Sequence, residues 1–200
     1  MSTKTKNILG IDLAGSNRRD TGVSTLCGKK FVYIGKVKTD DEIMNIIKKF
    51  RPVLVAVDAP LTLPKGRKDI DDKNGVHFRE CDLELRRLGI RFFPITIGPM
   101  RMLVKRGIRL KKIIEKLGIR VVEVFPGASY DIFGIDRKNR EKIVLRFRKM
   151  RYVFDKRKYT QDELDGMCCA ITGQMVLSKK AKALKGIDGT IFIPLGNHNT

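Results

Sequence analysis

Two short apolar runs, each ending in an aspartate, constrain the fold of this chain more than any other feature of its sequence. The first occupies residues 7–12 and ends at Asp12, and the second occupies residues 53–58 and ends at Asp58. The second run is continuously aliphatic, which is typical of a strand that is buried on both faces and pairs in parallel with its neighbour. Parallel pairing would bring both carboxylates to the carboxyl edge of one sheet, where α/β proteins bind ligands.

An aspartate at the end of a buried strand needs a compensating partner, because a carboxylate removed from water is costly unless a metal ion, an arginine or a backbone donor stabilises its charge. Two interpretations of Asp12 and Asp58 are open. Either they hold a divalent metal ion, or they cap the turns that follow the strands. Their occurrence as a pair at one predicted edge favours the metal ion.

The remaining elements are predicted from periodicity and from capping signals. Thr-x-x-Glu capping boxes open helices at Thr39 and Thr160, and a glycine-containing turn joins two β-rich runs into a hairpin. In chain order we expect strands at 7–12, 21–27 and 31–37, a helix at 40–50, a strand at 53–57, helices at 78–88 and 99–117, a strand at 120–126, an amphipathic helix within 137–158 and a last helix from 161.

This order of elements predicts an α/β fold with a five-stranded mixed sheet and helices on both faces. A closing edge strand is expected within residues 187–194. A chain of 200 residues is long enough for one domain with a sizeable core. We therefore expect a single domain over residues 1–200, with an inserted loop and helical region at about 61–118.

Two further acids join the candidate site. Glu123 interrupts an otherwise apolar strand, and Asp165 flanks the apolar stripe of the last helix, where its side chain can lie along the sheet edge. For Glu123, an ion pair with one of the many arginines is the alternative. Carboxylates gathered at one edge repel one another, and hard cations such as Mg²⁺ or Mn²⁺ relieve that repulsion. Two such ions about 3.5–4 Å apart catalyse phosphodiester cleavage.

The charge of the chain favours a polyanionic partner. Lys and Arg number 42 against 22 for Asp and Glu, a formal net charge of +20, which indicates nucleic acid before an anionic membrane surface. Residues 137–158 are densely basic, with apolar positions interleaved, and predict a helix with a cationic outer face. An ordinary solvated face is the alternative. The candidate phosphate contacts are Arg140, Arg146, Arg148, Lys149, Arg151, Lys156, Arg157 and Lys158.

Arg79 is a further candidate for phosphate binding. Asp82 lies one helical turn after it, so an internal salt bridge is the alternative interpretation. The chain has no apolar run of about 18 residues, and residues 1–6 contain no signal-peptide apolar region. We therefore expect a cytoplasmic protein that does not enter a membrane.

Five segments together resemble a family of predicted nucleases with the ribonuclease H-like fold. They are Gly-Ile-Asp-Leu-Ala-Gly at 10–15, Val-Asp-Ala-Pro at 57–60, Arg-Glu-Cys-Asp at 79–82, Glu-Val-Phe-Pro at 123–126 and the stretch from Asp162 to Gly173. The resemblance covers nearly the whole chain. It implies that Asp12, Asp58 and Asp165 are catalytic metal ligands, and that Glu123 is a further or supporting ligand.

One departure from the fold's best-known member concerns the first helix. Ribonuclease H carries an additional catalytic acid there, whereas Asp41 and Glu42 of this chain are explained by the helix cap. The leading hypothesis is a metal-dependent nuclease for structured or hybrid nucleic acid. The alternatives are a catalytically inactive nucleic-acid-binding protein of the same fold and a relative of the sugar-kinase and actin-like ATPases. A resolvase-like role would predict a twofold dimer.

Overall fold

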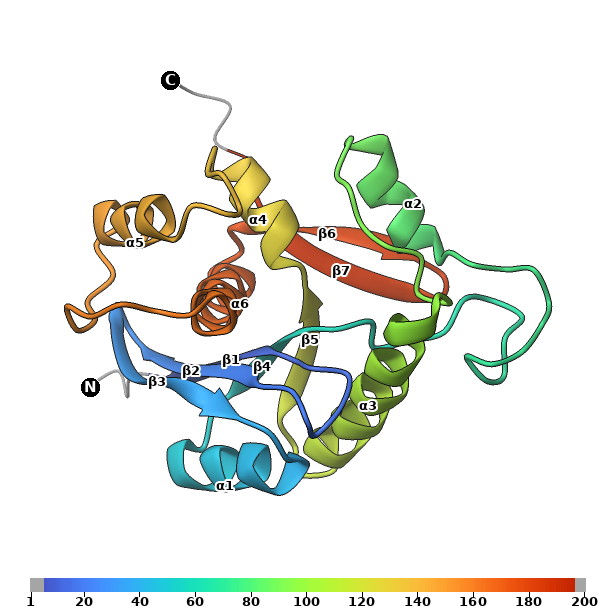
Figure 1. Cartoon of the computed structure of the whole chain (residues 1–200), viewed down its shortest axis with the longest axis horizontal. Helices are drawn as coiled ribbons and strands as arrows, with labels where there is room; N and C mark the ends of the chain where they lie inside the picture. Colours follow the sequence, from blue (N-terminus) through green and yellow to red (C-terminus); the bar gives the residue numbers. More distant parts are fainter. Residues whose placement is uncertain (1–5, 197–200) are drawn as a thin grey trace.

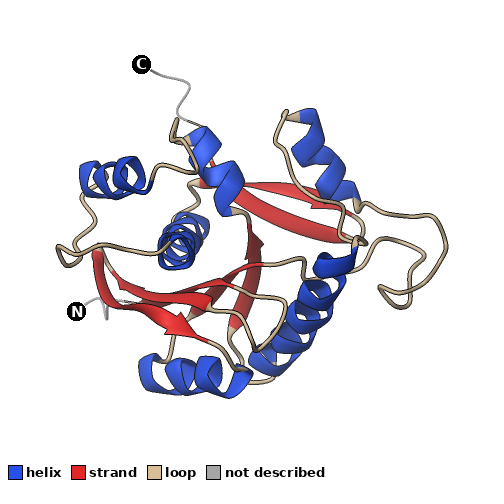
Figure 2. Cartoon of the chain, in the orientation of Figure 1, coloured by secondary structure: helices blue, strands red, loops and turns tan. Residues whose placement is uncertain are grey.

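The computed structural model describes residues 6–196, which build one seven-stranded mixed sheet with helices on both faces (Figures 1 and 2). The strand order across the sheet is β3-β2-β1-β4-β5-β7-β6. The strands are β1 (Asn7–Asp12), β2 (Thr21–Cys27), β3 (Lys30–Val37), β4 (Leu54–Asp58), β5 (Arg120–Val124), β6 (Ala181–Gly186) and β7 (Gly189–Pro194). The helices are α1 (Asp40–Phe50), α2 (Glu80–Arg87), α3 (Gly98–Glu115), α4 (Pro126–Ile132), α5 (Arg140–Lys149) and α6 (Gln161–Leu177).

The predicted α/β class is confirmed, and the predicted number of strands is wrong. The antiparallel meander of β1, β2 and β3 and the parallel pairs β1–β4 and β4–β5 are as expected. β7 is not an edge strand, because it pairs in parallel with β5 on one side and antiparallel with β6 on the other. β6 escaped prediction because its sequence, AKALKG, combines weak strand formers with a single buried residue, Leu184.

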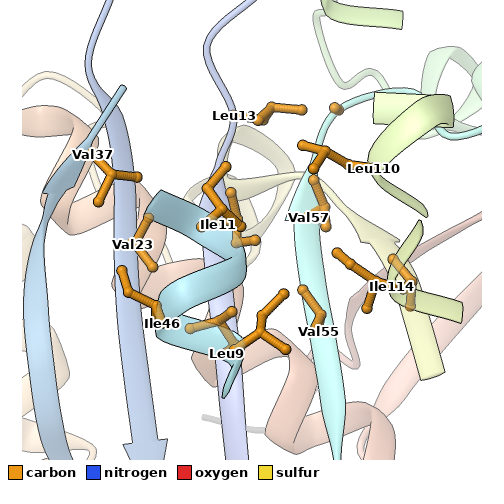
Figure 3. Close-up of a cluster of buried hydrophobic side chains, with 14 of the residues drawn as sticks. Leu9, Ile11, Leu13, Val23, Val37, Ile46, Val55, Val57, Leu110 and Ile114 are labelled. Atoms are coloured by element: carbon orange, nitrogen blue, oxygen red, sulfur yellow. The ribbon is translucent and has the colours of Figure 1, made fainter. Parts of the chain in front are cut away.

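Successive side chains of the central strands point to opposite faces of the sheet, and each face is covered by different helices. Leu9 and Ile11 of β1 pack with Ile46 of α1 and with Leu110 and Ile114 of α3 in one buried cluster (Figure 3). The intervening residues point to the other face, which α6 covers. The α6-side cluster contains Ile8, Leu54, Ala56, Val122, Val124 and Cys169. In Figure 1, α6 lies on one side of the sheet, with α1 and α3 on the other.

Glycines allow α6 to lie directly against the sheet. A Cβ atom at Gly10 would lie 2.2 Å from the carbonyl oxygen of Gly166, and one at Gly22 would lie 1.7 Å from that of Asp162. Ser24 of β2 donates a buried 2.8 Å hydrogen bond to the Gly166 carbonyl. The first turns of α6 are therefore held at backbone contact distance from β1 and β2, so a side chain from these turns can reach the end of β1.

The basic segment 137–158 is only partly helical, which corrects the prediction. α5 ends at Lys149, and Arg151 has a left-handed backbone with φ 64°. The chain then extends along the β2–β3 hairpin, where the Phe31 amide donates to the Val153 carbonyl at 2.9 Å and the Val153 amide donates to the Lys29 carbonyl at 2.8 Å. Among residues 6–196, no helix combines the length and apolar character that crossing a bilayer requires.

Candidate functional site

Asp12 and Asp58 lie side by side at the carboxyl edge of the sheet, as the sequence predicts. They are direct partners in the parallel register between β1 and β4. Each falls in phase with the residues that face α6, Asp12 with Ile8 and Gly10 and Asp58 with Leu54 and Ala56. Neighbouring strands are about 4.8 Å apart, so both half-buried carboxylates share one small region on the α6 side.

Asp165 brings a third carboxylate to this region from the second turn of α6. Two donors orient its Oδ1 atom: the Tyr130 hydroxyl at 2.6 Å and the Gln161 amide at 2.9 Å. Tyr130 comes from α4, a helix that the sequence analysis did not predict. Its signal was Pro126 at the first helical position, directly after the β5 strand.

Burial raises the pKa values of all three aspartates, and neighbouring carboxylates raise them further. Burial raises the pKa of Asp12 well above its ordinary value, and the charges of Asp58, Asp165 and Asp162 raise it further, while Arg19 acts in the opposite direction. Burial also raises the pKa of Asp58, with added repulsion from Asp165 and Glu123. For Asp165, burial raises the pKa to about 6 in spite of its two hydrogen-bond donors. Within residues 6–196, neither Asp12 nor Asp58 forms an ion pair.

These shifts predict how the stability of the metal-free protein depends on pH. The folded protein binds a proton at Asp165 at higher pH than the unfolded chain does, so the free energy of unfolding is expected to rise as pH falls from about 6.5 to about 4.5. Asp165→Asn should remove a contribution of at most about 3 kcal/mol to this rise. Urea unfolding of both proteins in EDTA at several pH values measures the difference, and a difference that does not change with pH would contradict the assignment.

Glu123 does not join the three aspartates. Val121 packs on the α1 and α3 side of the sheet and Val122 on the α6 side, so alternation puts Glu123 on the opposite face of the sheet from Asp12 and Asp58, although it lines the same cavity at the sheet edge and its charge still acts on Asp58. Its carboxylate accepts hydrogen bonds from Arg79 at 2.6 and 2.8 Å and from the Leu61 amide at 2.8 Å. This is the ion pair that the sequence left open as the alternative.

Arg79 is enclosed rather than available to a ligand. Its side chain is 1% exposed and also pairs with Asp82 at 2.7 Å and with the Thr62 hydroxyl at 3.0 Å. Every terminal nitrogen of the guanidinium is therefore occupied inside the protein. Of the two interpretations of Arg79, the structure therefore favours the internal salt bridge over the phosphate contact.

Of the basic candidates, four are exposed and free of the contacts that occupy the others: Lys149, Arg151, Lys156 and Lys158. Arg157 pairs with Glu163 in the first turn of α6 at 2.7 Å. Arg148 donates to the Asp155 carbonyl at 3.0 Å, and Arg140 to the Tyr159 carbonyl at 3.4 Å. Arg146 is half-buried, and its Nε atom has no partner among the described residues.

The donor set is chemically suited to a hard divalent cation, although its geometry is open. Among residues 6–196, no three His, Cys, Asp or Glu side chains are already arranged to hold a metal ion. Asp12 and Asp58 are nevertheless partners in the strand register that form no ion pair within residues 6–196, and the repulsion that Asp58 exerts on Asp12 is what a bound Mg²⁺ or Mn²⁺ would relieve. By this test the residues fit such an ion.

Sequence reasoning missed one cation near the site. Arg19 lies in the turn between β1 and β2, and its charge acts on Asp12. The available signal was the position of Arg18 and Arg19 in the connection that directly follows the Asp12 strand. A connection at the carboxyl edge of a sheet is where ligand contacts arise.

Comparison with solved structures relates this architecture to a known fold. Thermus thermophilus RuvC in complex with a Holliday junction substrate superposes with a TM-score of 0.56 at 13% sequence identity, covering 92% of this chain and 99% of that one. Another structure of RuvC from Thermus thermophilus superposes with a TM-score of 0.50, at the same identity and coverage. No protein-family model and no curated protein sequence matches the chain. At this identity the likeness shows the fold, which is ribonuclease H-like.

Proposed function

We propose that this protein is a metal-dependent nuclease that hydrolyses phosphodiester bonds of structured or hybrid nucleic acid. One observation carries the proposal: Asp12 and Asp58 are in register at the carboxyl edge of parallel strands, on the face where Asp165 also lies, and within residues 6–196 neither carboxylate forms an ion pair. Carboxylates gathered in this way lower the stability of the metal-free protein. A role in binding cations explains why the protein nevertheless contains them.

In this proposal Asp12, Asp58 and Asp165 hold Mg²⁺ or Mn²⁺, and Tyr130 and Gln161 orient Asp165. A bound divalent ion would lower the pKa of a water molecule and stabilise charge on the leaving oxygen. Glu123 is left out of the ligand set, because Arg79 and the Leu61 amide already occupy its carboxylate.

The partner is proposed from charge and from the structural neighbour. A net charge of +20 and the exposed cations of segment 149–158 suit a phosphate backbone, and Arg19 is placed to contact a phosphate next to Asp12. One RuvC structure of the same fold holds a Holliday junction, which supports branched DNA as a substrate class to test first.

The proposal is tested by a cleavage screen. The protein is incubated with a four-way junction, a forked duplex, a linear duplex, single-stranded DNA and an RNA–DNA hybrid, in Mg²⁺, in Mn²⁺ and in EDTA. We expect cleavage of at least one branched or hybrid substrate with either metal ion and none in EDTA. If no substrate is cut and neither metal ion changes the melting temperature, the carboxylates are not a metal centre.

The second candidate is a nucleic-acid-binding protein that has the fold without the activity. The observation that favours it is the open geometry of the three aspartates, which form no ready-made metal site in the described part of the chain. The same screen separates the two candidates, because a binding protein would shift the junction in a gel in EDTA and in Mg²⁺ without cutting it.

A further inference from the structure

A cavity of about 550 Å³ opens at the carboxyl edge of the sheet, directly beside the aspartates. Asp12 and Asp58 line part of it, Arg91 and Arg137 contribute cationic groups, and the buried ion pairs of Arg79 with Asp82 and Glu123 form another part of its wall. The rest of its wall is mainly apolar and aromatic and includes Leu85, Phe92, Phe93, Met100, Leu103 and Phe125. The linker between α2 and α3 supplies three consecutive members of this wall, Arg91, Phe92 and Phe93.

The wall of the cavity is held in place by its own contacts. Phe92 packs edge-to-face on Phe78 at 6.0 Å, and the Arg86 guanidinium lies 4.2 Å from the Phe78 ring. Arg137 donates to Asp131 at 2.8 Å and lies 5.7 Å from the Phe125 ring. These aromatic and guanidinium planes are therefore positioned before any ligand arrives, which lowers the entropic cost of binding.

Phe93 is the exception to this packing. It lines the cavity while 71% of its surface is exposed, more than any other large apolar side chain in the described residues. An exposed phenylalanine beside an apolar cavity offers a free ring face for stacking.

We propose that this cavity receives one unpaired nucleobase of the strand whose phosphate lies at Asp12 and Asp58. The assignment rests on the proposed function in taking the ligand to be a nucleic-acid strand. A nucleobase is a flat, uncharged group that suits an apolar aromatic wall, and base–aromatic stacking is sequence-tolerant. Arg91, which is exposed and forms no ion pair within residues 6–196, supplies a positive charge for a phosphate next to that base.

The cavity also defines the substrate class. A base within a duplex is stacked and paired, so it would have to unstack and unpair before it could enter a cavity of this kind, which costs free energy. That cost is smallest where the base is already unpaired. The preferred substrate is therefore a strand with an unpaired nucleotide next to the cleaved bond, as in a branch point, a bulge or a flap, rather than a continuous duplex.

The test measures binding in EDTA, so that its result does not depend on catalysis. A labelled duplex with one bulged adenosine is compared by fluorescence anisotropy with the same duplex carrying an abasic nucleotide at the bulge. We expect the wild type to bind the base-containing bulge about tenfold more tightly, within the range of stacking contributions. Phe93→Ala should remove most of this preference, and melting curves check that the variant is folded.

Met102→Ala is the matched control, because Met102 is 54% exposed on α3 and does not line the cavity. It should keep the wild-type preference. Equal affinity for the bulged and abasic duplexes overturns the cavity assignment alone. A clear preference for the base without cleavage of any substrate supports the cavity and overturns the nuclease. A free nucleoside monophosphate that bound as tightly as the bulged duplex would overturn the assignment to a strand.

Discussion

Asp58→Asn is expected to slow metal-dependent cleavage about a thousandfold while making the metal-free protein more stable. A bound metal ion stabilises the charge of the transition state by several kcal/mol, and Asp58 is proposed to be one of its ligands. Losing that stabilisation raises the activation free energy enough to slow the reaction by about this factor. The gain in stability follows because the substitution removes a buried charge that Asp165 and Glu123 repel. Gains from such charge optimisation are commonly about 0.5–2 kcal/mol. Single-turnover cleavage and urea unfolding in EDTA measure the two effects.

Asp41→Asn is the control for this experiment. Asp41 is an exposed acid in the first turn of α1. Removing its charge should leave cleavage unchanged and cost a few tenths of a kcal/mol, because an acid in the first turn of a helix interacts favourably with the helix dipole. If Asp41→Asn abolished cleavage, or Asp58→Asn did not, the site would lie elsewhere.

A combined gain in stability and loss of activity is what separates a metal centre from a structural role. If Asp12 and Asp58 only capped the turns after their strands, Asp58→Asn would not raise stability, because Asn caps as well as Asp, and Asp58→Ala would lower it. The sign of the stability change in EDTA therefore decides between the two interpretations that the sequence left open, even before a substrate is known.

The aspartate pair could be predicted from the sequence because both aspartates occupy the same place in equivalent strands. Two buried runs that each end in Asp and pair in parallel place their last residues together, and alternation directs Asp12 and Asp58 to the same face. The position of Asp165 followed from helical periodicity. The glycines at 10, 22 and 166 that let α6 approach the sheet were present in the sequence, but their mutual contact depends on a packing that only the structure shows.

Glu123 shows why the fourth acid could not be placed in the same way. A strand that is apolar on both faces carries no alternation to show which side its polar residue faces, and a shift of one residue exchanges the faces. The sequence also did not show that Arg79 is the ion-pair partner of Glu123. A fully buried arginine is uncommon, and its burial cannot be predicted from the residues next to it in the sequence. The short α4 helix and β6 strand were missed because their own patterns are weak and tertiary packing stabilises them.

Arg79→Met is expected to lower the free energy of unfolding by about 3–5 kcal/mol. The methionine fills the space of the arginine side chain with another unbranched side chain, but it leaves the carboxylates of Asp82 and Glu123 buried without a cation. Removing one partner from a buried ion pair destabilises a protein by an amount of this size. Arg87→Met is the control at the other end of helix α2, since Arg87 is 73% exposed and its ion pair with Glu84 should contribute about 0.5 kcal/mol or less. Chemical denaturation of the three proteins measures the effect.

The same variant decides what Arg79 does for the protein. If its guanidinium bound phosphate, Arg79→Met would keep its stability, bind nucleic acid more weakly and show a smaller dependence of affinity on salt. If it joins α2 to β5 and to the chain after β4, stability falls, and Glu123→Gln in the same chain recovers part of the loss by removing one of the two uncompensated charges. We expect the second result, because the contacts of Arg79 with Glu123, Asp82 and Thr62 leave no terminal nitrogen free for a ligand.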